Sequence, residues 1–471
     1  MKLNKLIDCQ YDIEIKGIKT NSLKVEDGDL FVCTNTGTMD RHLFIDDAIK
    51  KGAKAIIVSK DVNKDIPTIK VEDTNKTLSE IIPKFYNYPL NKIQLIGVTG
   101  TDGKTTVATI ISTLLDKCGY IGTNGISCGD YYEKTSNTTP GLEKLYEIFD
   151  YCVKNNIDKM AMEVSSEAIN YKRVEGIEFD CSIITNITKE HLNTHKTLEN
   201  YIMCKCQLFK NTKKEGFCIL NKDDAHFQEV YNSSNGKILT YGIGEDNDLI
   251  IKNVNLLSDK TIFTITYKNQ DYEITSPLLA MFNVYNLSAA LLAILALGYN
   301  INDILPKIKN LNVKGRLQEI NYGQDFKVFV DYAHTPNGIH ELLKFMNSLK
   351  HNKTIVVFSE PGERDRSKRP EKGFNVITNC DHAIVTSQDP RSEDPMDIAN
   401  DLISLVKDYK NYEIILDRRE AIRKAIDLAH ENDIVLIIGK GNENYQILKD
   451  RTIEFCDVDE VNNYLKEKFQ K

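Results

Sequence analysis

The chain has 471 residues, enough for about three domains of ordinary size. Hydrophobic residues make up 41% of it and charged residues 27%, a globular composition, and no apolar run approaches the ~20 residues of a membrane helix. The net charge of −8 argues against a nucleic-acid-binding protein, although a local basic pocket could still hold an anionic small substrate.

The N-terminal sequence and the cysteine pattern indicate where in the cell the protein is expected. The opening MKLNKLIDCQYDIEIKG carries charges throughout and has no apolar segment, so we expect no secretory signal and a cytoplasmic protein. The eleven cysteines are scattered without C-x-x-C pairs, which fits reduced thiols. Cys204 and Cys206 form a lone C-x-C, a weak zinc signal, and we expect both to be packing residues.

Residues 1–92 predict a small α/β unit. Leu30–Val32 and Ala55–Val58 are short apolar runs typical of strands, with a helix expected at Leu43–Gly52 between them. A proline-containing joint at Tyr88–Asn91 predicts the first boundary.

The next stretch predicts a phosphate-binding loop. Ile93–Ile96 is an apolar run typical of a buried strand, and the glycine-rich sequence GVTGTDGKTT follows it at Gly97–Thr106. Glycines let successive backbone N–H groups approach a phosphate. Lys104 adds a positive charge, and Thr105 offers a hydroxyl for Mg²⁺ at the start of a helix expected over Val107–Lys117.

Two further strands are expected to lie parallel to the first one. Lys159–Val164 places Glu163 at its carboxyl end, where such sheets carry a Mg²⁺ ligand or a water-orienting group, although a surface acid is the alternative. Asp180–Ile187 runs into a loop that contains His191 and His195. These histidines are either metal ligands or polar loop residues.

A helix expected over Leu198–Phe209 places Lys205 near its apolar face. A lysine there usually extends its amine to solvent. The alternative is a desolvated, neutral amine that takes up CO₂ as a carbamate, whose oxygens suit a hard cation. Further on, Leu249–Pro277 predicts a β-meander at the side of this unit. Asn283 and Asn286 precede an apolar helix and could cap it or read a purine edge.

From residue 314 strands and helices alternate again, which predicts an open doubly wound, Rossmann-like sheet. Ligands of such sheets bind beyond the carboxyl ends of the strands. Four polar loops fall there, and their shared edge favours a site over ordinary surface. They begin at Asp331 (DYAHTP), Pro361 (PGERDR), Asp389 (DPRSE) and Gly439 (GKGNE).

The motifs GVTGTDGKTT, MEVSS, TNITKEHLNTHKTLENYIMCKCQLF, FNVYN, DYAHTP, DPRSEDP and GKGNENYQ together resemble the Mur ligase family across the whole chain. The resemblance implies a three-domain α/β protein: a UDP-sugar-binding domain at 1–92, a central ATP-binding domain with a parallel sheet and side β-meander at 93–313, and a mobile C-terminal amino-acid-binding, Rossmann-like domain at 314–471. We also expect a monomer.

The resemblance further implies roles for individual residues at the nucleotide and its metal ions. Lys104, Glu163, His191 and carbamylated Lys205 are implied as catalytic residues, the last three with Thr105 as ligands of Mg²⁺. Contacts to ATP are implied for Gly100, Thr101, Asp102, Gly103, Lys104, Thr105, Thr106, Asn283, Arg316, Asp331 and His334.

Two groups of substrate-binding residues are implied as well. The UDP-sugar peptide is expected along Ser22, Thr138, Thr139, Ser165 and Arg173. The incoming amino acid is expected at Arg364, Asp389, Pro390, Arg391, Gly439 and Glu443.

The implied activity is an ATP-dependent amide ligase of peptidoglycan biosynthesis. It would add a diamino acid, best expected to be meso-diaminopimelate, to UDP-N-acetylmuramoyl-L-alanyl-D-glutamate through an acyl phosphate. A paralogue using L-lysine or another acceptor, a folylpolyglutamate synthase-like ligase and a non-catalytic nucleotide-binding regulator stay open. The chain departs from the family pattern at Asp102, Glu167, Gln388 and Asn442, where asparagine, histidine, aspartate and histidine are usual.

Overall fold

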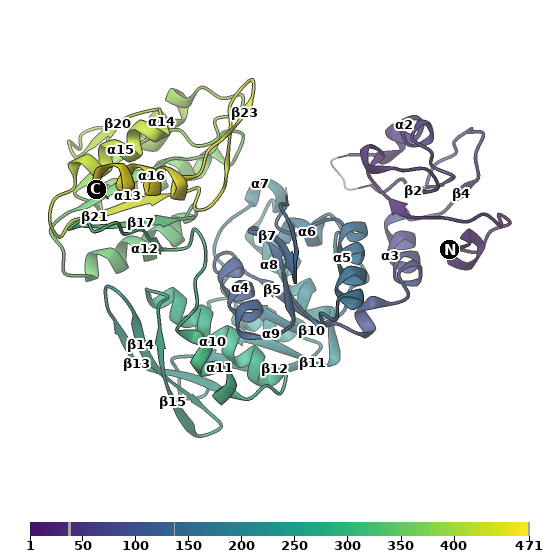
Figure 1. The fold of residues 1–471 in the computed structure, drawn as a ribbon, viewed down its shortest axis with the longest axis horizontal. Coiled ribbons are helices and arrows are strands. Elements are labelled where there is room, and N and C mark those ends of the chain that lie inside the picture. The colour runs from purple at the N-terminus through teal and green to yellow at the C-terminus, as the bar shows by residue number, and fades with distance from the viewer. Residues whose placement is uncertain (36–38, 136, 470–471) are drawn as a thin grey trace.

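The computed structural model describes residues 1–35, 39–135 and 137–469. The chain forms three bodies in sequence order, drawn purple, blue to teal, and green to yellow in Figure 1. No helix among the described residues is long and apolar enough to cross a membrane.

The first body is built on a parallel sheet of four short strands: β1 (Ile18–Lys19), β2 (Leu30–Val32), β3 (Ala55–Val58) and β4 (Thr68–Lys70). Its helical segments are α1 (Leu3–Leu6), η1 (Ser22–Lys24), η2 (Arg41–Phe44), α2 (Ile45–Lys50), α3 (Thr74–Phe85) and η3 (Pro89–Asn91). Both predicted strands are confirmed. The helix expected at Leu43–Gly52 instead begins as the 3₁₀ turn η2, where the Asp40 carboxylate accepts from the His42 N–H, and becomes α-helical only at Ile45.

The second body contains an eleven-stranded sheet in the order β15-β14-β13-β12-β11-β10-β5-β9-β6-β7-β8. Its parallel centre consists of β5 (Gln94–Thr99), β6 (Cys118–Gly122), β9 (Lys159–Glu163), β10 (Phe179–Ile184), β11 (Thr212–Asn221) and β12 (Lys237–Gly242). At one edge β7 (Gly125–Cys128) and β8 (Tyr131–Glu133) extend it in antiparallel order, and at the other edge β13 (Leu249–Leu256) pairs parallel with β12 and is followed by the antiparallel β14 (Thr261–Tyr267) and β15 (Gln270–Ser276). The expected β-meander is therefore a continuation of the same sheet.

Helices cover both faces of this sheet because its central strands are apolar on both sides. Leu95 and Ile96 of β5 belong to opposite core clusters. One face packs against α4 (Lys104–Leu114), α10 (Met281–Ala296) and α11 (Ile301–Ile308). The other face carries α5 (Leu142–Lys154), α6 (Ser166–Asn170), α8 (Leu198–Lys210) and α9 (Phe227–Ser233), and the short α7 (Leu192–His195) packs against α8.

The third body is a six-stranded sheet in the order β16-β17-β21-β18-β19-β20, parallel except for the edge strand β16. Its strands are β16 (Gln318–Glu319), β17 (Lys327–Asp331), β18 (Thr354–Phe358), β19 (His382–Val385), β20 (Tyr412–Ile414) and β21 (Ile434–Ile438), and a separate hairpin joins β22 (Tyr445–Ile447) to β23 (Thr452–Glu454). The helical segments are α12 (Pro336–Ser348), η4 (Arg366–Lys368), α13 (Arg369–Ile377), α14 (Pro395–Ile403), α15 (Arg418–Leu428) and α16 (Asp457–Phe469). The predicted doubly wound sheet is confirmed.

A buried ion pair fixes the carboxyl edge of the third sheet. Arg418 and Asp457 begin α15 and α16, both side chains are fully buried, and the guanidinium donates to both carboxylate oxygens at 2.7 Å. Arg418 also donates to the Ser359 hydroxyl at 2.9 Å and to the Ile438 carbonyl at 3.0 Å. One side chain therefore joins the ends of β18 and β21, from which the polar loops extend.

Candidate functional site

The predicted phosphate-binding loop connects β5 to α4. Two of its glycines have positive φ angles, +146° at Gly100 and +85° at Gly103. A Cβ would lie 1.8 Å from the Thr185 hydroxyl at the first position and 2.3 Å from the Asn286 amide oxygen at the second, so neither position accepts a side chain. The Lys104 ammonium donates to the carbonyls of Gly100 and Thr101 at 3.0 and 2.9 Å. The turn thus keeps an open cradle at the N-terminus of α4, which suits a phosphate group.

Glu163 lies fully buried at the end of the neighbouring strand β9. Its Oε1 accepts hydrogen bonds from the Tyr120 hydroxyl at 2.7 Å and from the Thr123 N–H at 2.9 Å. Oε2 has only a long contact of 3.4 Å with the Thr123 hydroxyl. Oε1 is therefore saturated while Oε2 retains acceptor capacity, as a metal-binding carboxylate requires. The surface-acid alternative for Glu163 is wrong.

Lys205 is 1% exposed, and its amine donates to the Gly100 carbonyl at 2.6 Å. Burial and the nearby Lys104 charge hold the pKa of this amine well below its usual value. The expectation that Lys205 extends its amine to solvent is wrong, and the lowered pKa favours the uncharged, nucleophilic form of the amine. Burial, Lys205 and Lys104 likewise lower the pKa of His191 to about 3, which leaves an uncharged imidazole able to bind a metal ion.

The chemistry of these donors fits Mg²⁺, although no three histidine, cysteine, aspartate or glutamate side chains of the described residues converge as ligands. Glu163, His191 and the Thr105 hydroxyl are the groups that would hold the ion here. Mg²⁺ usually binds only one or two carboxylates and completes its shell with water and phosphate oxygens. A small number of protein ligands beside a phosphate-binding loop is consistent with this coordination preference of Mg²⁺.

The third body contacts the phosphate-binding loop directly. Arg316 donates from Nη2 to the Thr105 hydroxyl at 3.0 Å. The Thr335 hydroxyl lies 3.1 Å from both carboxylate oxygens of Asp102. Lys368 forms an ion pair with Glu190 at 2.6 Å. The predicted nucleotide residues from the two bodies therefore meet around one space.

Backbone contacts orient two more of the predicted nucleotide residues. Asp331 accepts from the N–H groups of Leu317 at 2.5 Å and Ala333 at 2.6 Å, and burial raises the pKa of its carboxyl group. Nδ1 of His334 lies 3.1 Å from the Tyr332 carbonyl, and burial together with nearby lysine charges lowers the pKa of this histidine.

Asn283 and Asn286 line the same space without capping α10. The helix begins after Ala280, and no side chain forms a cap hydrogen bond there. Asn283 donates to the Leu279 carbonyl at 2.8 Å, and Asn286 donates to the Asn283 amide oxygen at 3.1 Å. The capping alternative is wrong, and a role in reading a base edge stays a prediction.

The predicted amino-acid pocket is built on a buried charge network. Lys440 is completely buried and pairs with Asp389 and Glu443, each at 3.1 Å. The Tyr332 hydroxyl donates to Glu443 at 3.0 Å, and burial raises the pKa of that carboxyl group. Asp389 also accepts from the Ile447 N–H at 3.0 Å, which fixes the β22–β23 hairpin beside the pocket.

Two arginines border this network. Arg391 donates to the Gly362 carbonyl at 2.8 Å. The exposed Arg364 has no hydrogen bond or ion pair with any described residue, although its charge acts on Tyr445. Gln388, where the family pattern has aspartate, donates to the Gly439 carbonyl at 3.2 Å and lies 3.3 Å from the Ser359 hydroxyl.

Four of the residues expected along the sugar peptide, all except Ser22, lie near α6. Ser165 caps this helix by accepting from the Ala168 N–H at 3.1 Å. Thr139 is buried and donates to the Glu163 carbonyl at 2.8 Å, while Arg173 donates to the Thr139 carbonyl at 3.2 Å. Thr138 lies 3.1 Å from the Thr123 hydroxyl. The buried Thr139 side chain therefore fixes the end of β9 beside Glu163.

These groups open into one cavity of about 760 Å³ between the second and third bodies. Twenty-one of the predicted site residues line it. The four exceptions are Gly100, Thr139, Pro390 and Ser22. The Gly100 carbonyl accepts hydrogen bonds from Lys104 and Lys205, Thr139 is buried, and Ser22 lies in the distant first body. Residues that the sequence interpretation did not select also line it, including Tyr201, Glu190, Tyr332, Thr335 and Lys368.

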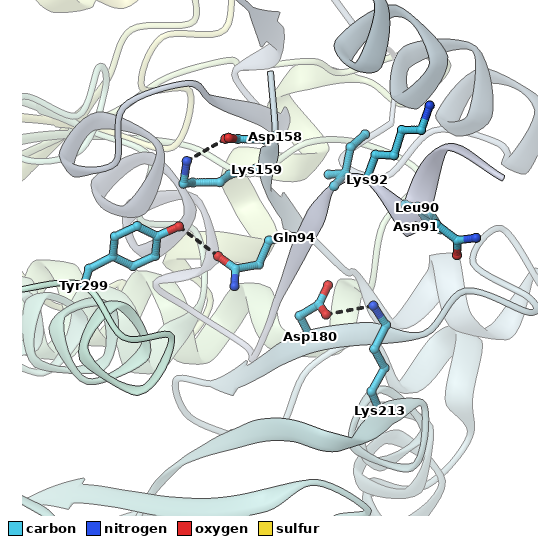
Figure 2. A pocket seen from close by; sticks show the side chains of 10 residues that line it. Leu90, Asn91, Lys92, Gln94, Asp158, Lys159, Asp180, Lys213 and Tyr299 are labelled. Carbon is cyan, nitrogen blue, oxygen red and sulfur yellow. Dashed lines mark hydrogen bonds and ion pairs between the residues drawn. The ribbon is translucent and has the colours of Figure 1, made fainter. Parts of the chain in front are cut away.

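A second hollow of about 590 Å³ lies at the amino ends of β5, β9 and β10, away from the phosphate-binding loop. Figure 2 shows three pairs in it: Asp158 with Lys159, Gln94 with Tyr299, and Asp180 with Lys213. None of the predicted site residues lines it. The cavity at the carboxyl ends is therefore the candidate site, as parallel sheets favour.

A phosphate cradle, the Oε2 atom of Glu163 and the buried Lys205 lie across this cavity from a charged pocket, an arrangement that suits a nucleotide-dependent ligase. Three family models match in order: "Mur ligase family, catalytic domain" over residues 14–95, "Mur ligase middle domain" over 98–294 and "Mur ligase, glutamate ligase domain" over 315–441. The chain belongs to the Mur ligase family.

Individual proteins are similar over the full length. A Bacillus cereus protein named UDP-N-acetylmuramoyl-L-alanyl-D-glutamate–2,6-diaminopimelate ligase is 38% identical, with 97% of each chain covered. A Clostridium acetobutylicum protein of the same name, numbered 1, is also 38% identical, with 100% of each covered. A solved structure with that ligase name has a TM-score of 0.70 at 28% identity and 99% coverage of both chains.

Proposed function

We propose that the chain is the ATP-dependent ligase that joins the amino group of a diamino acid to the D-glutamyl carboxylate of UDP-N-acetylmuramoyl-L-alanyl-D-glutamate. The full-length match at 38% identity to proteins named for this reaction carries the proposal. The shared cavity supports it, because the phosphate-binding loop and the amino-acid pocket open into the same space.

The second body would activate the carboxylate. ATP would supply the γ-phosphoryl group that converts the carboxylate into an acyl phosphate, which the amine then attacks with release of phosphate. Lys104 and the loop N–H groups would hold the phosphates. Glu163, His191 and a carbamate on Lys205 would hold Mg²⁺, which spreads negative charge over the reacting oxygens. The lowered pKa of Lys205 supports the carbamate, because only a neutral amine reacts with CO₂.

The third body would bind the amino acid. Two guanidinium groups, Arg364 and Arg391, border a pocket that also holds the carboxylate of Glu443. Arginine holds a carboxylate in two-point contact, and a carboxylate accepts an ammonium. This combination favours an amino acid whose far end carries both charges, as meso-diaminopimelate does, over L-lysine, which lacks the far carboxylate.

The first body, with Ser22 and domain bounds of 1–92, would hold the uridine nucleotide. The sugar peptide would extend from there past Thr138, Ser165 and Arg173 into the cavity. The bounds 93–313 and 314–471 for the other domains belong to the same proposal, as do a cytoplasmic location and a monomeric state.

The test is phosphate release from ATP in the presence of UDP-N-acetylmuramoyl-L-alanyl-D-glutamate, with single amino acids offered in turn and the product weighed by mass spectrometry. We expect turnover with meso-diaminopimelate and a product heavier by that residue. Turnover with L-lysine alone would assign the departures at Gln388 and Asn442 to a changed acceptor. Turnover only with a folate substrate and glutamate would refute the proposal in favour of a folylpolyglutamate synthase.

A further inference from the structure

Three basic side chains surround one buried aromatic ring beside the phosphate-binding loop. The ring belongs to Tyr201, which is 1% exposed and whose hydroxyl lies 3.1 Å from the Thr101 hydroxyl. The Lys205 amine lies 4.5 Å from its centroid, and the rings of His195 and His191 lie 5.3 and 6.1 Å from it. Spacings of four residues, 191 to 195 and 201 to 205, bring each pair to one side of its helical segment.

The two histidines differ in what they face. His191 lines the cavity, whereas His195 does not. The side chain of His195 is 6% exposed, and its Nε2 is buried without a hydrogen-bond partner among the described residues. The local turn uses the backbone of His195 instead, because its carbonyl accepts from the Asn200 amide at 3.0 Å and from the Thr197 N–H at 2.9 Å. One buried nitrogen of the imidazole thus lacks a hydrogen bond, and an unsatisfied buried polar atom lowers the stability of a folded protein.

Carbamylation would turn the Lys205 side chain from a hydrogen-bond donor into a hydrogen-bond acceptor. The Nζ lone pair attacks the carbon of CO₂, one C=O π bond passes to oxygen, and the nitrogen releases a proton to solvent, so that a group carrying one negative charge replaces the amine. Its two oxygens accept hydrogen bonds, which the unpaired imidazole N–H can supply.

We propose that His195 is the positioning residue for a carbamate on Lys205: its Nε2–H donates to one carbamate oxygen and leaves the other oxygen for Mg²⁺. This inference rests on the carbamate of the proposed function. A residue that forms a hydrogen bond with a metal ligand commonly fixes the orientation of that ligand in this way. It gives the two histidines of one loop separate tasks, His191 at the ion and His195 behind the carbamate.

The test compares His195→Phe, which keeps a ring against Tyr201 but removes the donor, with His195→Gln, which keeps a donor N–H. Each protein is titrated with ¹³C-bicarbonate at fixed pH, and the carbamate signal is measured by ¹³C NMR. The Lys205→Ala protein identifies that signal by its loss. We expect His195→Phe to need about tenfold more bicarbonate for half-maximal carbamylation, with His195→Gln within about threefold of the wild type.

Added bicarbonate should also restore turnover of the His195→Phe protein, which a general packing defect would not allow. Equal bicarbonate titrations for His195→Phe and the wild type would overturn the inference. Should both variants fold poorly, as judged by thermal unfolding, His195→Asn provides the comparison with a shorter donor. A wild-type protein without carbamate would overturn both this inference and the carbamate, while the mass of the ligation product still tests the ligase activity separately.

Discussion

The Thr335 hydroxyl, at the start of α12, lies 3.1 Å from both carboxylate oxygens of Asp102 in the phosphate-binding loop, so a residue 233 positions away holds that loop from across the cavity. Arg316 on Thr105 and Lys368 on Glu190 make two further contacts between the same bodies. Three polar contacts thus join the two bodies around the loop, and Leu279 and Ala280 add apolar packing against the third body. Closed sites of this kind exclude water from reactive intermediates.

We expect Asp102→Asn to raise the melting temperature at neutral pH. Burial raises the pKa of Asp102 above its usual 3.8, so the folded protein binds this proton more tightly than the unfolded chain does. Stability from this group is therefore lost as pH rises from about 4 through the pKa of the folded state. The amide carries no such charge and still accepts from Thr335. Calorimetry from pH 4 to 8 should show a gap of roughly 1–3 °C that opens with pH.

The exposed Asp130→Asn serves as the control, because it removes one carboxylate at the surface by the same substitution. A wild-type protein that is the more stable of the two at pH 8 would contradict the assignment of a buried, unfavourable charge to Asp102.

We expect Lys205→Ala to lower turnover by a factor of about 100 or more, because it removes the group that would carry the carbamate. Short carboxylates such as acetate should restore part of the rate by supplying the missing oxygens. Phosphate release measures both effects. Lys210→Ala, an exposed lysine at the end of the same helix, should behave as the wild type. Full activity of the Lys205→Ala protein would refute the carbamate.

We expect Tyr120→Phe to weaken metal use more than it weakens folding. The Tyr120 hydroxyl donates to Oε1 of Glu163 at 2.7 Å and so directs the other oxygen toward the cavity. Without it, the Mg²⁺ concentration for half-maximal turnover should rise about tenfold. Glu163→Gln should nearly abolish Mg²⁺-dependent turnover, since it removes the ligand itself. An unchanged Mg²⁺ titration for Tyr120→Phe would argue against a metal on Glu163.

We expect Arg418→Met to destabilise the third body by about 3–5 kcal/mol, because it leaves the buried carboxylate of Asp457 without its ion-pair partner. Urea unfolding measures this cost. Arg419→Met removes the neighbouring, half-exposed pair with Glu460 and should cost about 1 kcal/mol or less. Similar losses for the two variants would show that the Arg418 pair is not what fixes the ends of β18 and β21.

Local patterns sufficed for much of this protein. The phosphate-binding loop, the apolar strands of the second and third sheets and the polar loops at their carboxyl ends could be read from the sequence, because glycine spacing and hydrophobic periodicity express backbone requirements that act over a few residues. The same reading missed β6–β8, α5, the β22–β23 hairpin and α16, whose sequences mix polar and apolar residues.

Only the tertiary structure decided which atoms are available for chemistry. The Tyr120 hydroxyl donates a hydrogen bond to one oxygen of Glu163, which lies 43 residues away in the chain. The Lys205 amine donates to the Gly100 carbonyl, which lies 105 residues away. Nothing local in the chain marks Tyr201, Thr335 or the unpaired nitrogen of His195. Hydrogen bonding and desolvation at the site depend on partners that come together only in the folded protein. The sequence by itself therefore determined which residues reach the site, and the packing decided what each of them can do there.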